Sequence, residues 1–219
     1  MIEVIGIHYS TFARTVVSSL RELNIEYNQL GHLANSPKVL EYNPFGFIPV
    51  FVRKEDGKDI VLYETSAIAR YIDSEFSRKF RGSDLRLEVE IEKWISMSSS
   101  QVFNAITWGI VKARIAAEKA NKPEEQIKQD LATPNEKANK YILILEGLFK
   151  GPYVTGEELT WADLFLYPIL ADYKSMPEGA IIQRGGQATK IAEWMERMEQ
   201  RDSFKNTYKG SVADLRNSK

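Results

Sequence analysis

The chain has 219 residues, 43% of them hydrophobic, and a formal net charge of −1, which is ordinary for a globular protein of one large or two small domains. The near-zero charge gives no signal for nucleic acid or an anionic membrane, and no apolar run is long enough to span a bilayer. The absence of cysteine excludes disulfides, zinc–thiolate metal sites and cysteine nucleophiles. The N-terminus lacks a basic region before a hydrophobic core, so we expect no signal peptide and a cytoplasmic location.

The first 77 residues mix strand and helix patterns. Apolar residues alternate in some segments and recur at helical spacing in others, and Ser10 or Thr11 can cap the first helix. The expected strands are 2–8, 25–30, 50–52 and 60–63, and the expected helices are 12–23, 36–42 and 65–76. This order predicts an α/β domain of the thioredoxin-like kind over residues 1–77, with a right-handed connection between the first two strands.

The rest of the chain shows helical periodicity only. The charged segment 77–84 is interpreted as a linker, and an all-helical domain is expected over residues 84–210. Its helices are expected at 87–110, at 123–149 with Pro134 as a potential kink, after Thr160, and at 189–200. Thr160 and Asp163 predict a capping box at the start of the third of these helices.

The most informative stretch is 43–72, NPFGFIPVFVRKEDGKDIVLYETSAIARYI. Pro49 follows Ile48 at the start of a strand, where a cis peptide would leave the backbone of Ile48 aimed outward. Glu64 and Thr65 open the next helix, whose free amides and hydroxyl can bind an anion. Together these features predict a site for a peptide-like ligand that carries a carboxylate.

The motifs NPFGFIP and ETSAIARYI in this stretch resemble the NPxGxVP and ESxAIxxYI patterns of the glutathione S-transferase family. The resemblance implies a thioredoxin-like domain followed by an all-helical domain. It also implies that Pro49 is cis, that Ile48 pairs its backbone with the cysteinyl part of glutathione, and that Glu64 and Thr65 hold the γ-glutamyl end.

The resemblance extends to two positions near this motif. Basic residues at the place of Lys38 meet the glycyl carboxylate of glutathione in relatives; His32 competes for this role, and a solvated lysine is the alternative. Phi-like relatives often carry glutamine at the place of Phe47. This chain therefore lacks one side-chain hydrogen bond to the peptide, which implies weaker or altered binding.

Ser10 is the candidate for thiol activation. The sequence STFARTV at residues 10–16 resembles the S-x-x-x-R-x-V pattern of serine-type transferases, which implies that Ser10 donates to the glutathione sulfur and that Arg14 braces the helix start. Lowering a thiol pKa of ~8.5 by ~2 units requires about 2.7 kcal/mol, which one hydroxyl and a nearby helix N-terminus can supply. Tyr9 and Thr11 are alternative donors, and Ser10 could instead be only an N-cap.

A pocket for a second substrate is expected between the loop after the first strand and the long helix. Its candidate wall residues are Phe12, Phe103, Thr107 and Trp108. The alternative is that these residues belong to the core, because aromatic stripes on helices usually do. Phe45 matches the aromatic residue that many relatives insert into a partner subunit, which implies a homodimer.

The expected function is a glutathione transferase that conjugates glutathione to small electrophiles, with peroxide reduction as a second activity. Glutathione would be a co-substrate, and no cofactor, metal, nucleic acid or membrane is expected. One alternative is a non-catalytic interaction module like the N-terminal domain of elongation factor 1 gamma, which the insertion 54–58 favours. A regulator of nitrogen metabolism would need an Asn/Gln-rich extension, which this sequence lacks. The chain ends at Lys219 after a polar tail, which favours a stand-alone enzyme.

Overall fold

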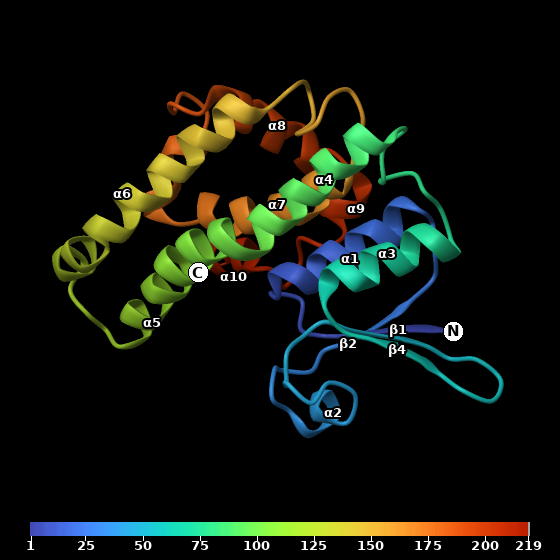
Figure 1. Ribbon diagram of the computed structural model, residues 1–219. Helices are drawn as coiled ribbons and strands as arrows, with labels where there is room; N and C mark the ends of the chain where they lie inside the picture. The colour runs from blue at the N-terminus through green and yellow to red at the C-terminus, as the bar shows by residue number, and fades with distance from the viewer. Residues whose placement is uncertain (219) are drawn as a thin grey trace. The chain divides into compact units, whose positions relative to one another are not determined.

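The computed structural model describes residues 1–218, which form two compact units (Figure 1). The N-terminal unit contains Met1–Gly82 together with Gln200–Ser218, and the helical unit contains Ser83–Glu199. This division differs from the expected helical domain of 84–210, because the last residues pack with the N-terminal unit. Within the described part of the chain, no helix is both long and apolar enough to cross a membrane.

A four-stranded mixed sheet forms the centre of the N-terminal unit, in the order β2-β1-β3-β4. The strands are β1 (Ile2–Ile5), β2 (Asn28–Leu30), β3 (Val50–Arg53) and β4 (Ile60–Leu62). β1 pairs in parallel with β2 and antiparallel with β3, and β3 and β4 form the expected hairpin. β1 and β2 are shorter than predicted, because the chain turns away after β1 and residue 25 still bonds back to the preceding helix.

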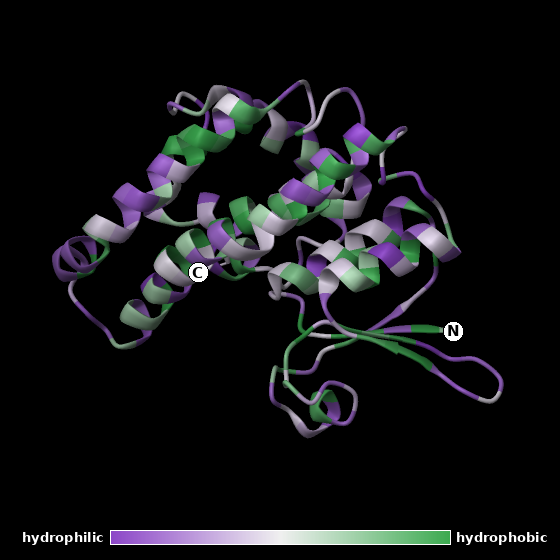
Figure 2. Cartoon of the chain, in the orientation of Figure 1, coloured by the Kyte–Doolittle hydropathy of each residue, from purple (hydrophilic) through white to green (hydrophobic). Residues whose placement is uncertain are grey.

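Helices cover both faces of this sheet. α1 (Thr11–Glu22) and α3 (Thr65–Glu75) lie on one face, and the short α2 (Pro37–Leu40) lies on the other (Figure 1). Alternation along β3 explains this arrangement: Val50 and Val52 pack against Val39 of α2, whereas Phe51 makes an edge contact with Tyr71 of α3. The two central strands, β1 and β3, are therefore largely hydrophobic (Figure 2) and mostly buried, whereas the edge strands β2 and β4 are more exposed.

The C-terminal segment contains two short helices that the sequence analysis missed, α9 (Asp202–Lys205) and α10 (Val212–Asn217). Arg201 binds both carboxylate oxygens of Glu22 at 2.6 and 2.7 Å, and the Ser203 hydroxyl donates to the same carboxylate at 2.6 Å. These bonds attach the segment to the end of α1. The expected polar tail is thus an ordered part of the N-terminal unit.

The helical unit begins with a continuous helical run that changes type. It comprises α4 (Leu85–Met97), the π-helical segments η1 (Ser98–Val102) and η2 (Asn104–Lys112), and α5 (Ala113–Lys119). The predicted long helix is therefore confirmed in position, but half of it is wound more loosely than an α-helix. The remaining elements are α6 (Glu124–Leu148), α7 (Trp161–Lys174), the 3₁₀ segment η3 (Pro177–Ile182) and α8 (Thr189–Glu199).

The predicted capping box at the start of α7 is confirmed. The Asp163 carboxylate accepts from the backbone N–H of Thr160 and of Val154, each at 2.9 Å, and from the Trp194 indole at 2.9 Å. Asp163 is fully buried, and burial raises its pKa despite these donors. One carboxylate thus joins the start of α7, the preceding turn and α8.

Candidate functional site

The loop between β1 and α1 presents the Ser10 hydroxyl at the first turn of α1. Ser10 is the N-cap with extended backbone (φ −77°, ψ 118°), and its Oγ accepts from the Ala13 N–H at 3.4 Å. The side chain is only partly buried. Because the oxygen is the acceptor in the capping bond, the hydroxyl proton remains available for a second partner. Capping and donation to a ligand are therefore compatible at Ser10.

The two alternative donors lie in different environments. Tyr9 is 43% exposed, whereas Thr11 is only 6% exposed because it belongs to the packed first turn of α1. Arg14, assigned by resemblance to brace this helix start, is 2% exposed. Their roles toward a ligand stay predictions, but burial disfavours Thr11 as a direct contact.

The Ile48–Pro49 peptide is cis, as predicted. It lies against Gly6 at the end of β1: a Cβ added there would be 3.4 Å from the Ile48 Cβ and 3.2 Å from the Ala13 Cβ. The absence of a side chain at Gly6 therefore lets the first turn of α1 approach the residue before the cis-proline. Ile48 is half-buried and packs on the sheet core. The structure thus brings the turn that Ser10 caps next to Ile48.

Asn43 holds the loop that leads into Pro49, a role that the sequence analysis did not assign. Its side chain donates to the Phe47 carbonyl at 2.9 Å and accepts from the Phe45 N–H at 3.0 Å, and it is 1% exposed. The signal was the Asn-Pro pair, because asparagine side chains often bond backbone two residues on. Phe47 itself is 62% exposed, so it contributes a backbone carbonyl to this loop rather than a packed side chain.

The start of α3 supplies the second part of the predicted site. Glu64 is the N-cap residue but has φ 67° and ψ 110°, and its side chain makes no capping hydrogen bond. Non-glycine residues rarely adopt positive φ, and such strain is concentrated at functional sites. Glu64 is exposed and Thr65 half-buried. This helix start can therefore offer backbone amides and a hydroxyl to an anion.

Lys38 in α2 already has partners. Its ammonium donates to Glu41 at 2.9 Å and to the Tyr42 hydroxyl at 3.2 Å, and the hydrogen bond that it donates to Glu41 raises the pKa of Lys38. An ammonium has three donors, so one remains for a ligand carboxylate. His32, the competing candidate, is half-buried in the loop after β2.

The candidates for a second-substrate pocket are divided between the two units. Phe12 is a half-buried residue of α1, and Phe103 is half-buried between η1 and η2. Trp108 is 55% exposed, with the Lys112 ammonium 3.4 Å from its ring centre. Thr107 is only 3% exposed, so it belongs to the helical core rather than to an open wall. Phe12, Phe103 and Trp108 remain predicted pocket residues.

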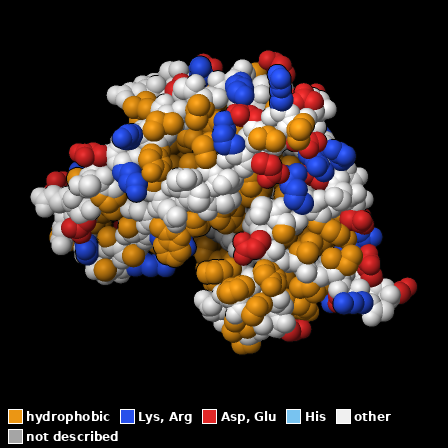
Figure 3. All heavy atoms as spheres, viewed as in Figure 1, with side chains coloured by type: hydrophobic (Ala, Val, Ile, Leu, Met, Phe, Trp, Pro, Cys, Tyr) orange, Lys and Arg blue, Asp and Glu red, His pale blue; other side chains and the backbone are white. Residues whose placement is uncertain are grey.

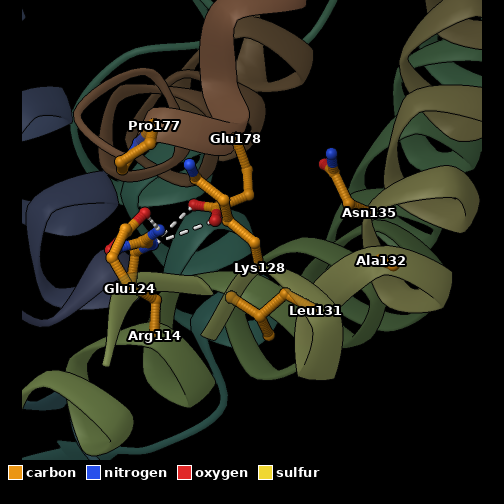
Figure 4. A pocket seen from close by; sticks show the side chains of 8 residues that line it. All are labelled: Arg114, Glu124, Lys128, Leu131, Ala132, Asn135, Pro177 and Glu178. Atoms are coloured by element: carbon orange, nitrogen blue, oxygen red, sulfur yellow. Dashed lines mark hydrogen bonds and ion pairs between the residues drawn. The ribbon is translucent and has the colours of Figure 1, made fainter. Parts of the chain in front are cut away.

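A cavity of about 240 Å³ lies within the helical unit, where the sequence analysis expected no site (Figure 4). Arg114, 2% exposed, donates to the carboxylates of Glu124 at 2.7 Å, Glu178 at 2.8 Å and Glu118 at 3.1 Å. Glu124 in particular holds the pKa of Arg114 above its ordinary value. This cluster links α5, α6 and η3. Because the guanidinium is satisfied by protein carboxylates, we interpret it as structural.

Comparison with known proteins yields matches over most of the chain. Residues 9–75 match the model of the glutathione S-transferase N-terminal domain, and residues 106–202 match that of the C-terminal domain. The chain is 26% identical over 180 residues to glutathione S-transferase GstB of Escherichia coli, covering 78% of this chain and 82% of that protein.

One solved structure and one further relative complete the comparison. The crystal structure of glutathione transferase F7 from Populus trichocarpa superposes with a TM-score of 0.79 at 25% identity, covering 96% of this chain and 99% of that one. Probable elongation factor 1-gamma 2 of Arabidopsis thaliana is 34% identical over 82 residues, which is 36% of this chain and 19% of that protein.

Proposed function

This chain belongs to the glutathione S-transferase family, and we therefore propose that it transfers the thiol of glutathione to small electrophiles. The observation that carries the proposal is the position of a partly buried Ser10 on the turn that approaches Ile48 across Gly6, beside the cis-Pro49, in a chain that matches both domains of the family. Glutathione acts as a co-substrate in this proposal.

Each part of glutathione has a proposed partner in the N-terminal unit. The backbone of Ile48 pairs with the cysteinyl part, and the start of α3 at Glu64 and Thr65 holds the γ-glutamyl end. The exposed Glu64 carboxylate suits the ligand's ammonium, and the helix amides suit its carboxylate. The third donor of Lys38 is assigned to the glycyl carboxylate.

The proposed chemistry requires a thiolate. Ser10 donates its hydroxyl proton as a hydrogen bond to the sulfur, which favours the charged form and lowers the thiol pKa. The thiol proton passes to solvent, the sulfur attacks the electrophilic carbon, and a C–S bond forms as the leaving group departs or an epoxide opens. With an organic hydroperoxide, two glutathione molecules give the disulfide, the alcohol and water.

The alternative is a non-catalytic module like the one in elongation factor 1 gamma. One observation favours the transferase: the elongation-factor match spans 36% of this chain, whereas the match to GstB spans 78%.

A homodimer is the proposed assembly. Phe45 is 67% exposed although it is a large apolar side chain. Within residues 1–218 its only aromatic neighbour is Tyr63, whose ring meets it edge to face with the centroids 6.4 Å apart. Orange hydrophobic side chains gather over the part of the N-terminal unit around α2 (Figure 3). The exposed large apolar residues in and around α2 include Leu33, Leu40 and Phe45. A symmetric interface would remove this apolar area from water.

Two measurements on the purified protein test the function. The first is retention on immobilised glutathione with elution by free glutathione. The second is conjugation of an aryl halide and an epoxide, with reduction of an organic hydroperoxide measured in parallel. Retention with turnover supports the proposal, and Ser10→Ala should keep the retention. Retention without turnover of any of the three substrates would favour the binding module. The absence of both retention and turnover would contradict the transferase and the glutathione-binding module alike.

A further inference from the structure

A second cavity, of about 330 Å³, lies wholly within the N-terminal unit. It is formed by the β1–α1 loop, α1, β2 with the residue before it, and the C-terminal segment after α9. Its lining includes three cationic side chains, Arg14, Arg21 and Lys209, and also His8. No carboxylate side chain of residues 1–218 lines this cavity. Cations thus converge on one space without an acidic residue there.

Two of these cations have no carboxylate partner among the described residues. Arg21 donates to the Tyr27 hydroxyl at 2.8 Å and stacks over its ring, but it has no carboxylate partner within residues 1–218. Lys209 likewise forms no ion pair in that part of the chain. Arg14 contributes a guanidinium that is 2% exposed. By contrast, Arg201 nearby is fully engaged by Glu22. Arg21 and Lys209 therefore keep donors that can reach an anion.

We propose that this cavity, which we call the basic cavity, binds a small polyanion bearing phosphate or clustered carboxylate groups. Like charges that converge on a confined space repel one another, and a bound anion removes that repulsion. Guanidinium groups bind such oxygens with strong, charge-assisted hydrogen bonds. Neutral donors, among them Thr207 and Gln29, complete a polar wall. The volume suits a molecule of the size of pyrophosphate or citrate rather than a polymer.

The basic cavity is separate in composition from the predicted glutathione site. None of Ser10, Ile48, Pro49, Glu64 or Thr65 lines it. It nevertheless shares the β1–α1 loop, because His8 lies two residues before Ser10 and a Cβ on Gly210 would be 3.0 Å from the His8 Cβ. The ligand is therefore expected to bind together with glutathione rather than in its place.

Isothermal titration with pyrophosphate, and separately with citrate, tests the proposal at neutral pH, low constant ionic strength and without divalent cations. We expect saturable binding of one anion per chain. Arg21→Met and Lys209→Met should each weaken it about ten-fold, the usual cost of one charge-assisted hydrogen bond. The matched control is Lys205→Met, which removes a 52% exposed lysine of the same segment that does not line the cavity; its affinity should not change.

The anion that binds more tightly identifies phosphate or carboxylate as the preferred chemistry, and unchanged affinity with saturating S-methylglutathione supports a distinct site. The proposal is overturned if neither anion binds saturably, if both variants bind as tightly as Lys205→Met, or if S-methylglutathione displaces the anion. Should Arg21→Met lower the melting temperature, Lys209→Met decides alone, because Lys209 is exposed.

Discussion

Ser10 combines two uses of one hydroxyl. Its oxygen accepts from the Ala13 N–H, which caps α1, and its proton is left for a ligand. The cap also fixes the side-chain direction, so a sulfur at the helix start would meet both the hydroxyl and the positive end of the helix dipole. Structural and chemical roles at this residue are therefore separable only by measurements of both stability and turnover.

We expect Ser10→Ala to lower turnover about ten-fold or more, because a thiolate loses its hydrogen-bond donor and each 1.36 kcal/mol corresponds to a factor of ten. The free energy of unfolding should fall by about 1 kcal/mol through the lost cap. Glutathione affinity should change little. Steady-state kinetics and thermal unfolding measure these effects. Tyr9→Phe is the control; if it abolishes turnover while Ser10→Ala does not, the tyrosine is the thiol contact.

Substitutions of Glu64 can distinguish the effect of backbone strain on stability from the effect of the carboxylate on ligand binding. At φ 67° a glycine is free of the strain that a Cβ produces. Glu64→Gly should therefore be more stable than Glu64→Ala by about 1 kcal/mol in chemical denaturation. Both variants remove the carboxylate, so both should bind glutathione more weakly in titration calorimetry. Binding equal to that of the original chain in Glu64→Ala would show that the carboxylate does not contact the ligand.

At this scale the sequence allowed some features to be predicted and not others. The cis peptide before Pro49 and the cap at Ser10 depend on neighbouring residues, so local motifs indicated them. The left-handed backbone of Glu64 and the buried amide of Asn43 depend on how the loop meets the sheet and α3. Such features are set by tertiary packing, which a local pattern does not contain. The ligand roles of these residues remain predictions.

At the scale of elements, the start of α7 depends on a single buried carboxylate. Asp163→Ala leaves the N–H groups of Val154 and Thr160 and the Trp194 indole without their acceptor. We expect the free energy of unfolding to fall by about 3–5 kcal/mol, as for other buried charge networks that lose one partner. Urea denaturation measures it. Asp163→Asn keeps one acceptor and should lose less; equal losses would contradict this account.

The attachment of the C-terminal segment should depend on pH. Burial alone raises the pKa of Glu22, but hydrogen bonds from Arg201 and Ser203 outweigh it, so the net pKa lies below the ordinary 4.5. A carboxyl with a lowered folded-state pKa stabilises the fold above its unfolded pKa and loses that effect as the pH falls through the folded value.

Glu22→Gln should therefore melt at a lower temperature than the original chain near neutral pH, by an amount that corresponds to about 1.5–3 kcal/mol. The difference between the two melting temperatures should shrink below the ordinary carboxyl pKa of 4.5. Calorimetry across this pH range measures it. Glu26→Gln, an exposed carboxylate beyond the end of α1, is the control and should show no such difference. A gap that persists at acid pH would rule out the ion pair as its source.

Helical periodicity predicted the positions of most helices. It did not predict that part of the long helix is π-helical, and it did not predict α9 and α10. The π-helical segments η1 and η2 keep apolar residues at spacings that also fit an α-helix, so the pattern did not distinguish them. α9 and α10 have four and six residues, too few for a periodic stripe. α9 is held by the pair Glu22–Arg201, whose members lie 179 positions apart in the sequence. Long-range polar contacts of this kind leave no local signal.

At the scale of the whole molecule, the order of elements was predictable because strand and helix periods differ sharply before and after Gly82. The membership of residues 200–218 in the N-terminal unit was not, because it arises from contacts with α1. The β1–α1 loop consequently has a C-terminal neighbour, Gly210 beside His8. Truncation at residue 200 would therefore remove support from the loop that carries Ser10.

Exposed apolar surface leads to the last prediction, that Phe45 anchors a homodimer. Phe45 and Phe47 lie on one loop and are similarly exposed, 67% and 62%. Only Phe45 is expected to lie in the interface, so Phe47 serves as its control. Phe45→Asp would place a charge in an apolar contact that both subunits share, and the cost is counted twice by symmetry. Sedimentation equilibrium at micromolar concentration should show a dimer for the original chain and for Phe47→Asp, but a monomer for Phe45→Asp with unchanged circular dichroism. If the original chain is a monomer, the proposed dimer is wrong. If Phe45→Asp is still a dimer, Phe45 does not lie in the interface.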